Sequence, residues 1–463
     1  MCVLDIRTNS EYDYSVQNIG SQIHSRRTNM RFKANHSGYS VFYSKLFSII
    51  CPIALQQLML AAVSASDALM LGFVNQNSLS AVSLASQITF VFNLFMGGLT
   101  IGTSILAAQY YGKGDMDSIE KICAYVIKIS FFISSLFFLA SLFIPQILMQ
   151  IFTKETTLID GGIIYLRIVA ASYLFTGISQ IYLCILKNTG YAIKSMVIGS
   201  SAVIINIFLN AALIFGLLFF PKMGIAGAAL ATSVSKLIEM IWTYIESLRK
   251  NRAKIKVKYC FRVNKMLVKD YWKYTIPMLG DYIVWGCGFT MYSIIMGHLG
   301  SDAVAANSIT NIVKNLIVSF CTGLANGGGI IIGNELGTGN LKQAKIYGKL
   351  LCKLAVISGI LSGIFLVIML PFIVSVVDLS PQATEYLKYM LILCACYMVA
   401  KSINMTTIAG IFPAGGDSKF GLICDAITMW IFAVPVGFFA AFYLQLPVVI
   451  VFLIINLDEV VKV

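Results

Sequence analysis

Charged residues are scarce in this chain of 463 residues, at 12% of all positions, against about 25% in a typical soluble domain. Apolar residues fill 58% of the positions, and the mean hydropathy is +0.81. The composition therefore excludes an ordinary soluble protein and indicates a chain that lies largely within a lipid bilayer.

Histidine is scarcer still. The chain has only His24, His36 and His298, and none of them lies in the middle of an apolar run. It contains neither the HExxH pattern of zinc enzymes nor the GxxxxGK[ST] loop that holds nucleoside triphosphates. These absences argue against an enzyme and against an ATP-driven pump, and we expect neither a structural metal nor another cofactor.

Cysteine occurs at eleven positions, but without the spacing of a disulfide framework or a metal site. The only close pair is Cys394 and Cys396. We interpret the cysteines as buried free thiols of a protein in a reducing compartment. Residues 1–40 contain no apolar core of the length that a signal peptide needs, and we expect them to form a polar cytosolic arm.

Long apolar runs dominate the rest of the chain. A helix needs about 20 apolar residues to cross about 30 Å of hydrocarbon. Twelve such runs, the last of them short, begin near Leu46, Val82, Ile122, Gly161, Ser195, Gly224, Tyr274, Ala303, Tyr347, Glu385, Ser418 and Leu446. The sequence therefore predicts an all-α integral membrane protein with twelve transmembrane helices.

Positive charge is concentrated in one connecting segment. Residues 248–273 contain ten Lys or Arg and the single acid Asp270. In a soluble protein, the net charge of +13 would suggest a nucleic-acid partner, but here its placement follows the positive-inside rule of membrane proteins. We therefore expect a multi-pass protein of the plasma membrane with both termini in the cytoplasm and no nucleic-acid partner.

The chain contains an internal repeat. A shift of 225 positions brings Pro52 onto Pro277 and aligns five of the six glycines between residues 72 and 114 with glycines, where chance would align about half of one. Because each copy holds an even number of spans, six, the copies are related by an axis along the membrane normal. We predict two six-helix lobes, at residues 41–247 and 274–463, joined by a basic cytoplasmic linker at 248–273.

The two copies agree in glycine and proline but not in charge. Asp67 lies in the apolar stretch AAVSASDALMLGFV and maps onto Tyr292, whereas Asp281 maps back onto Gln56. An ionised Asp near the centre of a spanning helix costs about 2.5 to 3.5 kcal/mol on insertion scales and usually faces a cavity or a partner. The unpaired acids are therefore the first candidates for function.

Four stretches of the chain resemble the multidrug and toxic compound extrusion (MATE) family of antiporters. They are PIALQQLMLAAVSASDALMLGFVNQNSLSAVSLASQ, GGLTIGTSILAAQYYGKGD, GHLGSDAVAANSI and AGGDSKFGLICDAITMWIFAVPVGF. The resemblance runs from about Val41 to the C-terminus. It implies a rocker-switch exporter that exchanges H+ or Na+ for small organic, often cationic, compounds, with a cavity between the lobes. We expect such a transporter to act as a monomer in the lipid bilayer.

The resemblance also implies a coupling-ion site in the first lobe. Asp67 matches the acid that the family carries in its first span. Asn206 and Asn210 match a pair in the fifth span, and their spacing of four places them on one helical face. Thr232 matches, less closely, a hydroxyl of the sixth span. One branch of the family has an Asp at the position of Asn210, so this site carries one charge fewer.

A second set of candidates lies in the second lobe. Another branch of the family uses a Glu in the seventh span, where this chain has Trp285, and the nearest acid is Asp281. Lys401 falls near mid-membrane by helical rise, and a lysine at that depth needs a partner. We expect an ion pair with Asp281, and Asp425 is the other candidate partner. A role for Lys401 in binding substrate or protons is the alternative.

The residues favour H+ over Na+ as the coupling ion. A Na+ site takes several oxygen ligands with net negative charge, whereas the first-lobe site offers one carboxylate among neutral oxygens. A proton needs only that carboxylate, Asp67. Binding of Na+ stays open near Asp67 or near Asp281. The alternative function within transport is a lipid-linked precursor flippase of the same superfamily, and a channel is a third.

Overall fold

The computed structural model describes residues 38–72, 76–217, 220–260, 264–377 and 379–463, and the regular structure in these ranges is helical. Most of the predicted arm, residues 1–40, lies outside them. The helices of the first half are α1 (Gly38–Gly72), α2 (Gln76–Lys113), α3 (Met116–Phe143), α4 (Pro145–Gln150), α5 (Thr156–Asn188), α6 (Ala192–Phe215) and α7 (Ile225–Ser247). Residues 44–463 form one compact unit, and the residues before them form another.

The second half begins after a short 3-10 turn, η1 (Val257–Cys260). Its α-helices are α8 (Lys265–Gly297), α9 (Ser301–Gly337), α10 (Leu341–Val376), α11 (Pro381–Thr406), α12 (Phe412–Ala414), α13 (Lys419–Asp425), α14 (Val434–Phe438), α15 (Val448–Asn456) and α16 (Asp458–Val461). Three π-helical stretches lie between some of them, η2 (Thr407–Ile411), η3 (Ala426–Ala433) and η4 (Phe439–Tyr443).

The predicted all-α membrane fold is confirmed. Within the described ranges, ten helices are long and apolar enough to cross a bilayer, counting α11 to α12 as one and α13 to η4 as another. The eleventh span is α8, which is as long as these but less apolar, and the twelfth is the short pair α15 and α16. Helix α8 begins at Lys265, so the last residues of the predicted linker are already helical.

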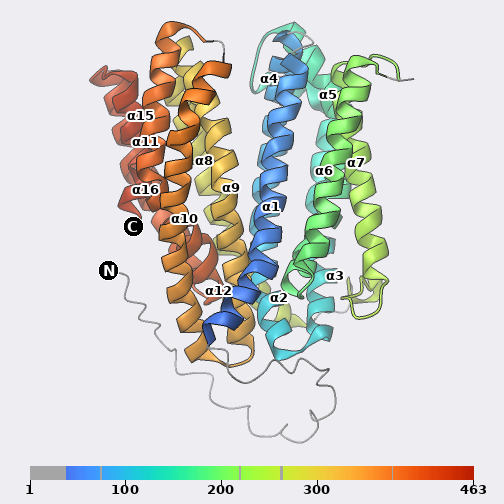
Figure 1. The fold of residues 1–463 in the computed structure, drawn as a ribbon. Coiled ribbons are helices and arrows are strands. Elements are labelled where there is room, and N and C mark those ends of the chain that lie inside the picture. Colours follow the sequence, from blue (N-terminus) through green and yellow to red (C-terminus); the bar gives the residue numbers. More distant parts are fainter. Residues whose placement is uncertain (1–37, 73–75, 218–219, 261–263, 378) are drawn as a thin grey trace, which may run out of the picture. The chain divides into compact units, whose positions relative to one another are not determined.

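The internal repeat is visible in local geometry. Figure 1 shows α1 to α7 gathered on one side and α8 to α16 on the other. At equivalent turns, Gly114 and Gly339 have φ angles of +76° and +78°, which favour glycine because a Cβ is disfavoured there. The next residues, Asp115 and Asn340, each accept a backbone N–H bond as the N-cap of the following helix. Each half of the chain therefore forms a six-helix lobe, and the two lobes have equivalent turns.

Close contacts between the lobes follow the same symmetry. A Cβ added to glycines of α2 or α9 would collide with the opposite lobe. The colliding pairs are Gly98 with Leu279 and its equivalent Gly323 with Ala54, and Gly102 with Thr275 and its equivalent Gly327 with Ile50. Glycine lets helix backbones approach closely in a bilayer, where packing replaces the hydrophobic effect as the force between helices. The paired glycines therefore join α1 to α9 and α8 to α2.

The connection at which α2 turns into α3 lies at the end of the bundle that also holds the basic segment 248–260, because Lys256 pairs with Glu120 of α3 and Tyr259 donates to Asp117. We call this the basic end. Two glycines meet there near the repeat axis: a Cβ on Gly112 would strike the carbonyl oxygen of Asn334, and a Cβ on Gly337 would strike that of Gln109. The two lobes are thus in backbone contact at the basic end.

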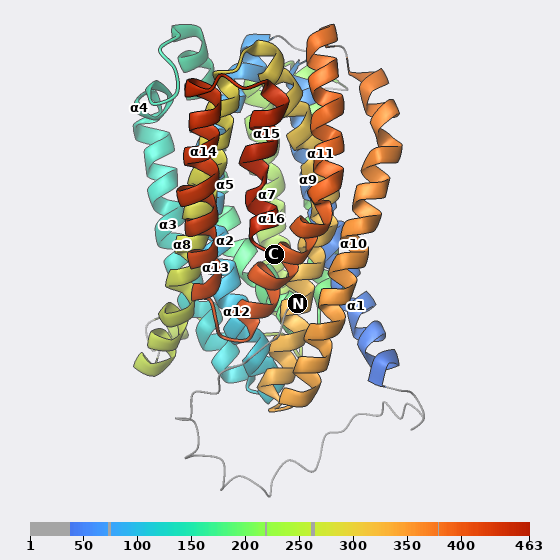
Figure 2. The ribbon, with the colours of Figure 1, turned by 90° about the vertical axis from the view of Figure 1, so that its left-hand side faces the viewer.

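Helices α15 and α16 return along α11, as Figure 2 shows. The apolar core of the second lobe includes Phe452 of α15 together with Leu391 and Leu366. This packing brings the charged residues of α16, Asp458 and Glu459, into the interior, where they are 3% and 7% exposed. A charged segment is therefore held inside the second lobe.

Candidate functional site

The first-lobe candidates come together in one hydrogen-bonded chain. The Asn210 amide nitrogen donates to Asp67 Oδ1 at 2.5 Å and also to Asn206 Oδ1 at 3.1 Å. The Asn206 amide nitrogen in turn lies 3.4 Å from both Thr232 Oγ1 and Ser235 Oγ. All four predicted residues belong to this set, and Ser235 of α7 is a fifth member that the sequence analysis did not identify. The sequence feature that could have identified Ser235 is its position three residues after Thr232.

Three helices position this chain of donors. Asp67 lies on α1, the two asparagines lie one turn apart on α6, and Thr232 and Ser235 lie on α7. Asn210 is fully buried, whereas Asp67 is partly exposed. Because the Asn210 amide donates a hydrogen bond to Asp67, this contact favours a negative charge on the carboxylate.

One oxygen of this set has no partner. Asn210 Oδ1 is buried and accepts no hydrogen bond from the part of the chain that the structure describes. A buried acceptor without a donor costs free energy. Asn210 Oδ1 is therefore available to accept a hydrogen bond or to contact an incoming cation. The carboxyl of Asp67, once protonated, would be such a donor after a rotation of the Asn210 amide.

The predicted partner of Lys401 is wrong. Lys401 Nζ lies 2.5 Å from Glu459 Oε1, and neither Asp281 nor Asp425 pairs with it. Asn404, one turn further along α11, donates to the same glutamate at 3.0 Å. An ion pair at mid-membrane was expected, but its acid comes from α16, because α15 and α16 reach to the depth of Lys401.

Asp425 has a different cation. Lys462 Nζ lies 3.0 Å from Asp425 Oδ1 and 3.0 Å from Asp458 Oδ2. The sequence analysis overlooked Asp458, Glu459 and Lys462. Their signal was the spacing of four between Asp458 and Lys462 directly after an apolar run, which indicates an ion pair on one helical face.

Asp281 stands apart from these pairs. Its Oδ1 is buried without a hydrogen-bond partner among the described residues. Asp425 is near enough to act on it electrostatically, and so is Lys462. Asp281 is thus a buried acid of the second lobe without a bonded partner, four residues before Trp285.

Trp285 belongs to an aromatic group between the lobes. Its ring stacks on that of Phe289 with centroids 5.8 Å apart and planes at 15°. Phe90 of the first lobe lies 6.4 Å from Trp285 and 6.3 Å from Phe289. Lys314 of α9, which the sequence analysis did not single out, has its ammonium 5.7 Å from the centre of the Phe289 ring.

Ligands for a structural metal are lacking in the described residues, where no three His, Cys, Asp or Glu side chains are grouped to hold one. Within this set, Asn206 Oδ1 and Thr232 Oγ1 already accept hydrogen bonds, and Asn210 Oδ1 is buried without a donor among the described residues. A hard cation takes about six oxygens. The set therefore offers a metal ion few oxygens that are not already bonded.

The basic end is closed. Lys45 of α1 pairs with Glu335 of α9 at 2.5 Å, and Gln109 of α2 donates to the carbonyl oxygen of Ala414 at 3.2 Å. A pocket between the lobes beside these contacts measures only about 20 Å³, whereas ligand pockets usually measure about 300 to 1,000 Å³. Its volume is that of roughly one water molecule, so this pocket does not hold a drug-sized compound.

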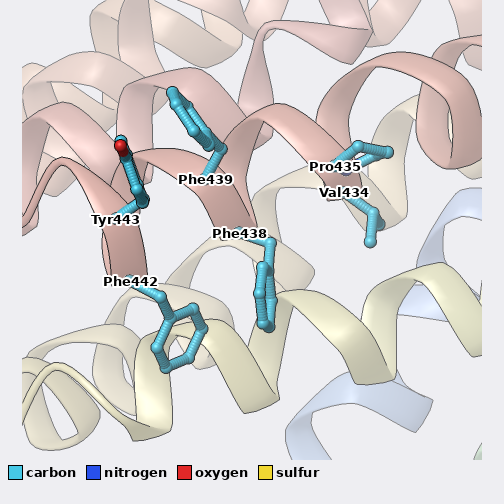
Figure 3. A pocket seen from close by; sticks show the side chains of 6 residues that line it. All are labelled: Val434, Pro435, Phe438, Phe439, Phe442 and Tyr443. Atoms are coloured by element: carbon cyan, nitrogen blue, oxygen red, sulfur yellow. The ribbon is translucent and has the colours of Figure 1, made fainter.

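A larger apolar pocket lies elsewhere, on the surface of the second lobe. Figure 3 shows its six lining side chains, all from α14 and η4: Val434, Pro435, Phe438, Phe439, Phe442 and Tyr443. Phe438 and Phe442 point to one side of the helix, and Phe439 and Tyr443 point to the other. An exposed apolar surface of one spanning helix is typical of contact with lipid, so we do not assign this pocket to the site.

Comparison with known proteins identifies relatives along most of the chain. The model of the MatE family matches residues 52–212 and 277–439, more than half of the chain and once in each lobe. The uncharacterized transporter YisQ of Bacillus subtilis is 24% identical over 420 residues, which cover 90% of this chain and 91% of that protein. The multidrug resistance protein PmpM of Pseudomonas aeruginosa is 22% identical, with 85% and 83% covered.

Solved structures share the fold. A MOP superfamily transporter from Pyrococcus furiosus superposes with a TM-score of 0.82 at 18% identity, over 91% of this chain and 93% of that one. The same TM-score, identity and coverage are found for an outward-facing multidrug resistance MATE family transporter of the MOP superfamily. At such identity the likeness concerns the fold alone.

Proposed function

This chain belongs to the MatE family of membrane transporters, and from that premise we propose that it exports small organic compounds, often cationic, in exchange for H+. Relatives whose names state a role, such as PmpM, are multidrug resistance proteins. These names support export of varied compounds over transfer of a lipid-linked precursor. The observation that carries the proposal is the single carboxylate of Asp67 at the end of the amide chain of Asn210 and Asn206.

The proposed coupling step is the protonation of Asp67. The ionised carboxylate accepts the Asn210 amide hydrogen. The protonated form has a hydroxyl to donate, and Asn210 Oδ1, which lacks a donor, is the nearest acceptor for it after the amide rotates. The two protonation states thus require two arrangements of the same side chains. Such a pair of states is what coupling demands, because an ion shifts an equilibrium only by binding one state better than the other.

Na+ is the alternative coupling ion. Beside Asp67 it would find one carboxylate and few free oxygens, which disfavours it there. Asp281 keeps the alternative open in the second lobe, because its nearest cation, Lys462, already lies between Asp425 and Asp458. Transport that depends on Na+ would therefore direct attention to Asp281.

Access is proposed to alternate by rocking of the lobes. The closed basic end, with its Lys45–Glu335 pair, suits a state open toward the opposite side. We further propose that the protein works as a monomer in the plasma membrane with both termini and the basic end in the cytoplasm. The ten Lys and Arg of residues 248–273 support this orientation.

The test is efflux of ethidium from inverted vesicles under an imposed pH gradient or an imposed Na+ gradient, applied separately. We expect a pH gradient to drive export in Na+-free buffer. Asp67→Asn should abolish that export with expression unchanged, because the amide keeps the shape but cannot take up a proton. Asp160→Asn, at an exposed aspartate of α5, is the matched control and should leave export unchanged. Transport that is absent without Na+ and restored by Na+ would overturn the assignment of H+.

A further inference from the structure

Lys314 is a cation inside the bundle without a carboxylate of its own. It lies 13 residues into α9, about 20 Å along the helix at 1.5 Å per residue. Among the described residues, Lys314 forms no ion pair, whereas Lys401 and Lys462 each have an acid within 3.0 Å. A lysine at membrane depth is expensive unless it is paired or functional, so its position requires an explanation.

The nearest acids are already engaged. Asp458 and Glu459 act on Lys314 through space, together with Lys401, which repels it. However, Glu459 is bonded to Lys401, and Asp458 is bonded to Lys462. These acids therefore act on the charge of Lys314 from a distance, but neither of them forms an ion pair with it.

The surroundings of Lys314 are aromatic and reach the other lobe. Its ammonium lies over Phe289, Phe289 stacks on Trp285, and both rings contact Phe90 of α2. All four side chains are partly exposed, so none is sealed within a core. A flat ring that entered between the lobes here would contact aromatic side chains of both lobes beside one ammonium.

From this arrangement we propose that Lys314, Trp285, Phe289 and Phe90 form a substrate subsite for aromatic carboxylates. The ligand ring stacks on the aromatic faces, and its carboxylate pairs with the Lys314 ammonium, a charge-assisted contact stronger than a neutral one. The subsite rests on the proposed export function and extends it from cations to compounds that carry an aromatic acid. Its ammonium, Lys314, lies on α9 of the second lobe, whereas Asp67 lies on α1 of the first, so one compound could present an acid to one lobe and a cationic group to the other.

The test is equilibrium binding to the purified full chain in lipid nanodiscs, which does not require transport. The probes are anthracene carboxylate, its neutral analogue anthracene methanol, and ethidium. We expect wild type to bind the carboxylate roughly tenfold or more tighter than the alcohol, the scale of one charged hydrogen bond. Lys314→Met should remove this preference and Lys314→Arg should keep it.

Two further variants separate the ring contact from the charge. Trp285→Leu should weaken both anthracene probes by a similar factor of a few, because stacking does not depend on the ligand's charge. Lys353→Met, which removes an exposed lysine of α10, should change nothing. A preference for the carboxylate that survives Lys314→Met overturns the subsite, as does its absence from wild type. Loss of export with the binding preference intact would instead count against the proposed function.

Discussion

Asn210 decides how much negative charge the first-lobe site holds. It places an amide 2.5 Å from Asp67, at a position where one branch of the resembled family has a second acid. Two carboxylates at such a distance cannot both ionise unless a cation lies between them. The identity of this one residue therefore bears directly on which ion couples transport.

We predict that Asn210→Asp makes export respond to Na+. The second carboxylate supplies the missing charge and oxygens, so ethidium efflux by this variant should rise several-fold when Na+ is added to Na+-free vesicles. Asn210→Ala is the control, because it removes the amide without adding charge and should gain no response. If the aspartate variant stays indifferent to Na+, the oxygens of this site are not arranged to hold that ion.

A second prediction concerns the Lys401–Glu459 pair. Lys401→Ala leaves Glu459 charged and buried, a loss that costs about 3 to 5 kcal/mol when one member of a buried pair is removed. We expect a clear drop in melting temperature in detergent and recovery of much of it by adding Glu459→Gln. Adding Asp281→Asn instead should recover nothing, since Asp281 does not contact the lysine. Recovery by the Asp281 variant would reinstate the partner that the sequence suggested.

The sequence predicted the individual residues of the site better than it predicted which residues they contact. Asp67 was identified as an acid within an apolar run, and Asn206, Asn210 and Thr232 were identified through the resemblance to the family. The partner of Lys401 was missed because depth along a helix says nothing about which helix faces it, and because the last run was too short to be counted at that depth. Lys314 was missed for a simpler reason: one lysine hardly alters the hydropathy of a 37-residue helix.

At the scale of elements, composition and spacing predicted nearly everything that is regular. Twelve spans, their order and their repeat follow from hydropathy and from glycine positions. The π-helical stretches η2, η3 and η4 have no such signal, because they depend on how a helix is packed rather than on its own residues. They occur in the two spans of the second lobe that hold Lys401 and Asp425, and π-helical turns are frequent at functional sites.

The glycines of α2 and α9 give a third prediction. A methyl group at Gly337 would strike the carbonyl oxygen of Gln109, backbone that cannot rotate away. Gly337→Ala should therefore push the lobes apart at the basic end, lowering the melting temperature and slowing export. Gly297→Ala is the matched control, since nothing lies within 4 Å of its added methyl group. If both variants show the same melting temperature and the same export rate, the structure around Gly337 accommodates the methyl group without a loss of stability.

On the scale of the whole molecule, the two lobes are held together at the basic end by contacts of different strength. The backbone contacts of the glycines are rigid. The Lys45–Glu335 pair is softer, because the lysine side chain is 43% exposed. Exposed ion pairs are worth about 0 to 1 kcal/mol, which corresponds to no more than about a fivefold change in an equilibrium. The pair is therefore suited to adjust the balance between states rather than to hold one of them.

We accordingly predict that Glu335→Gln shifts the population toward a basic end that is open, by up to about fivefold. Spin labels at Lys113→Cys and Lys342→Cys, two exposed positions on the connections of opposite lobes, would report this shift as a larger share of long distances. Lys121→Ala breaks an ion pair within α3 that does not join the lobes and should leave the distances unchanged. Because the labelled ends separate only if the lobes move as bodies, a shift confined to one label, or none at low ionic strength, would contradict a rocking motion that this pair restrains.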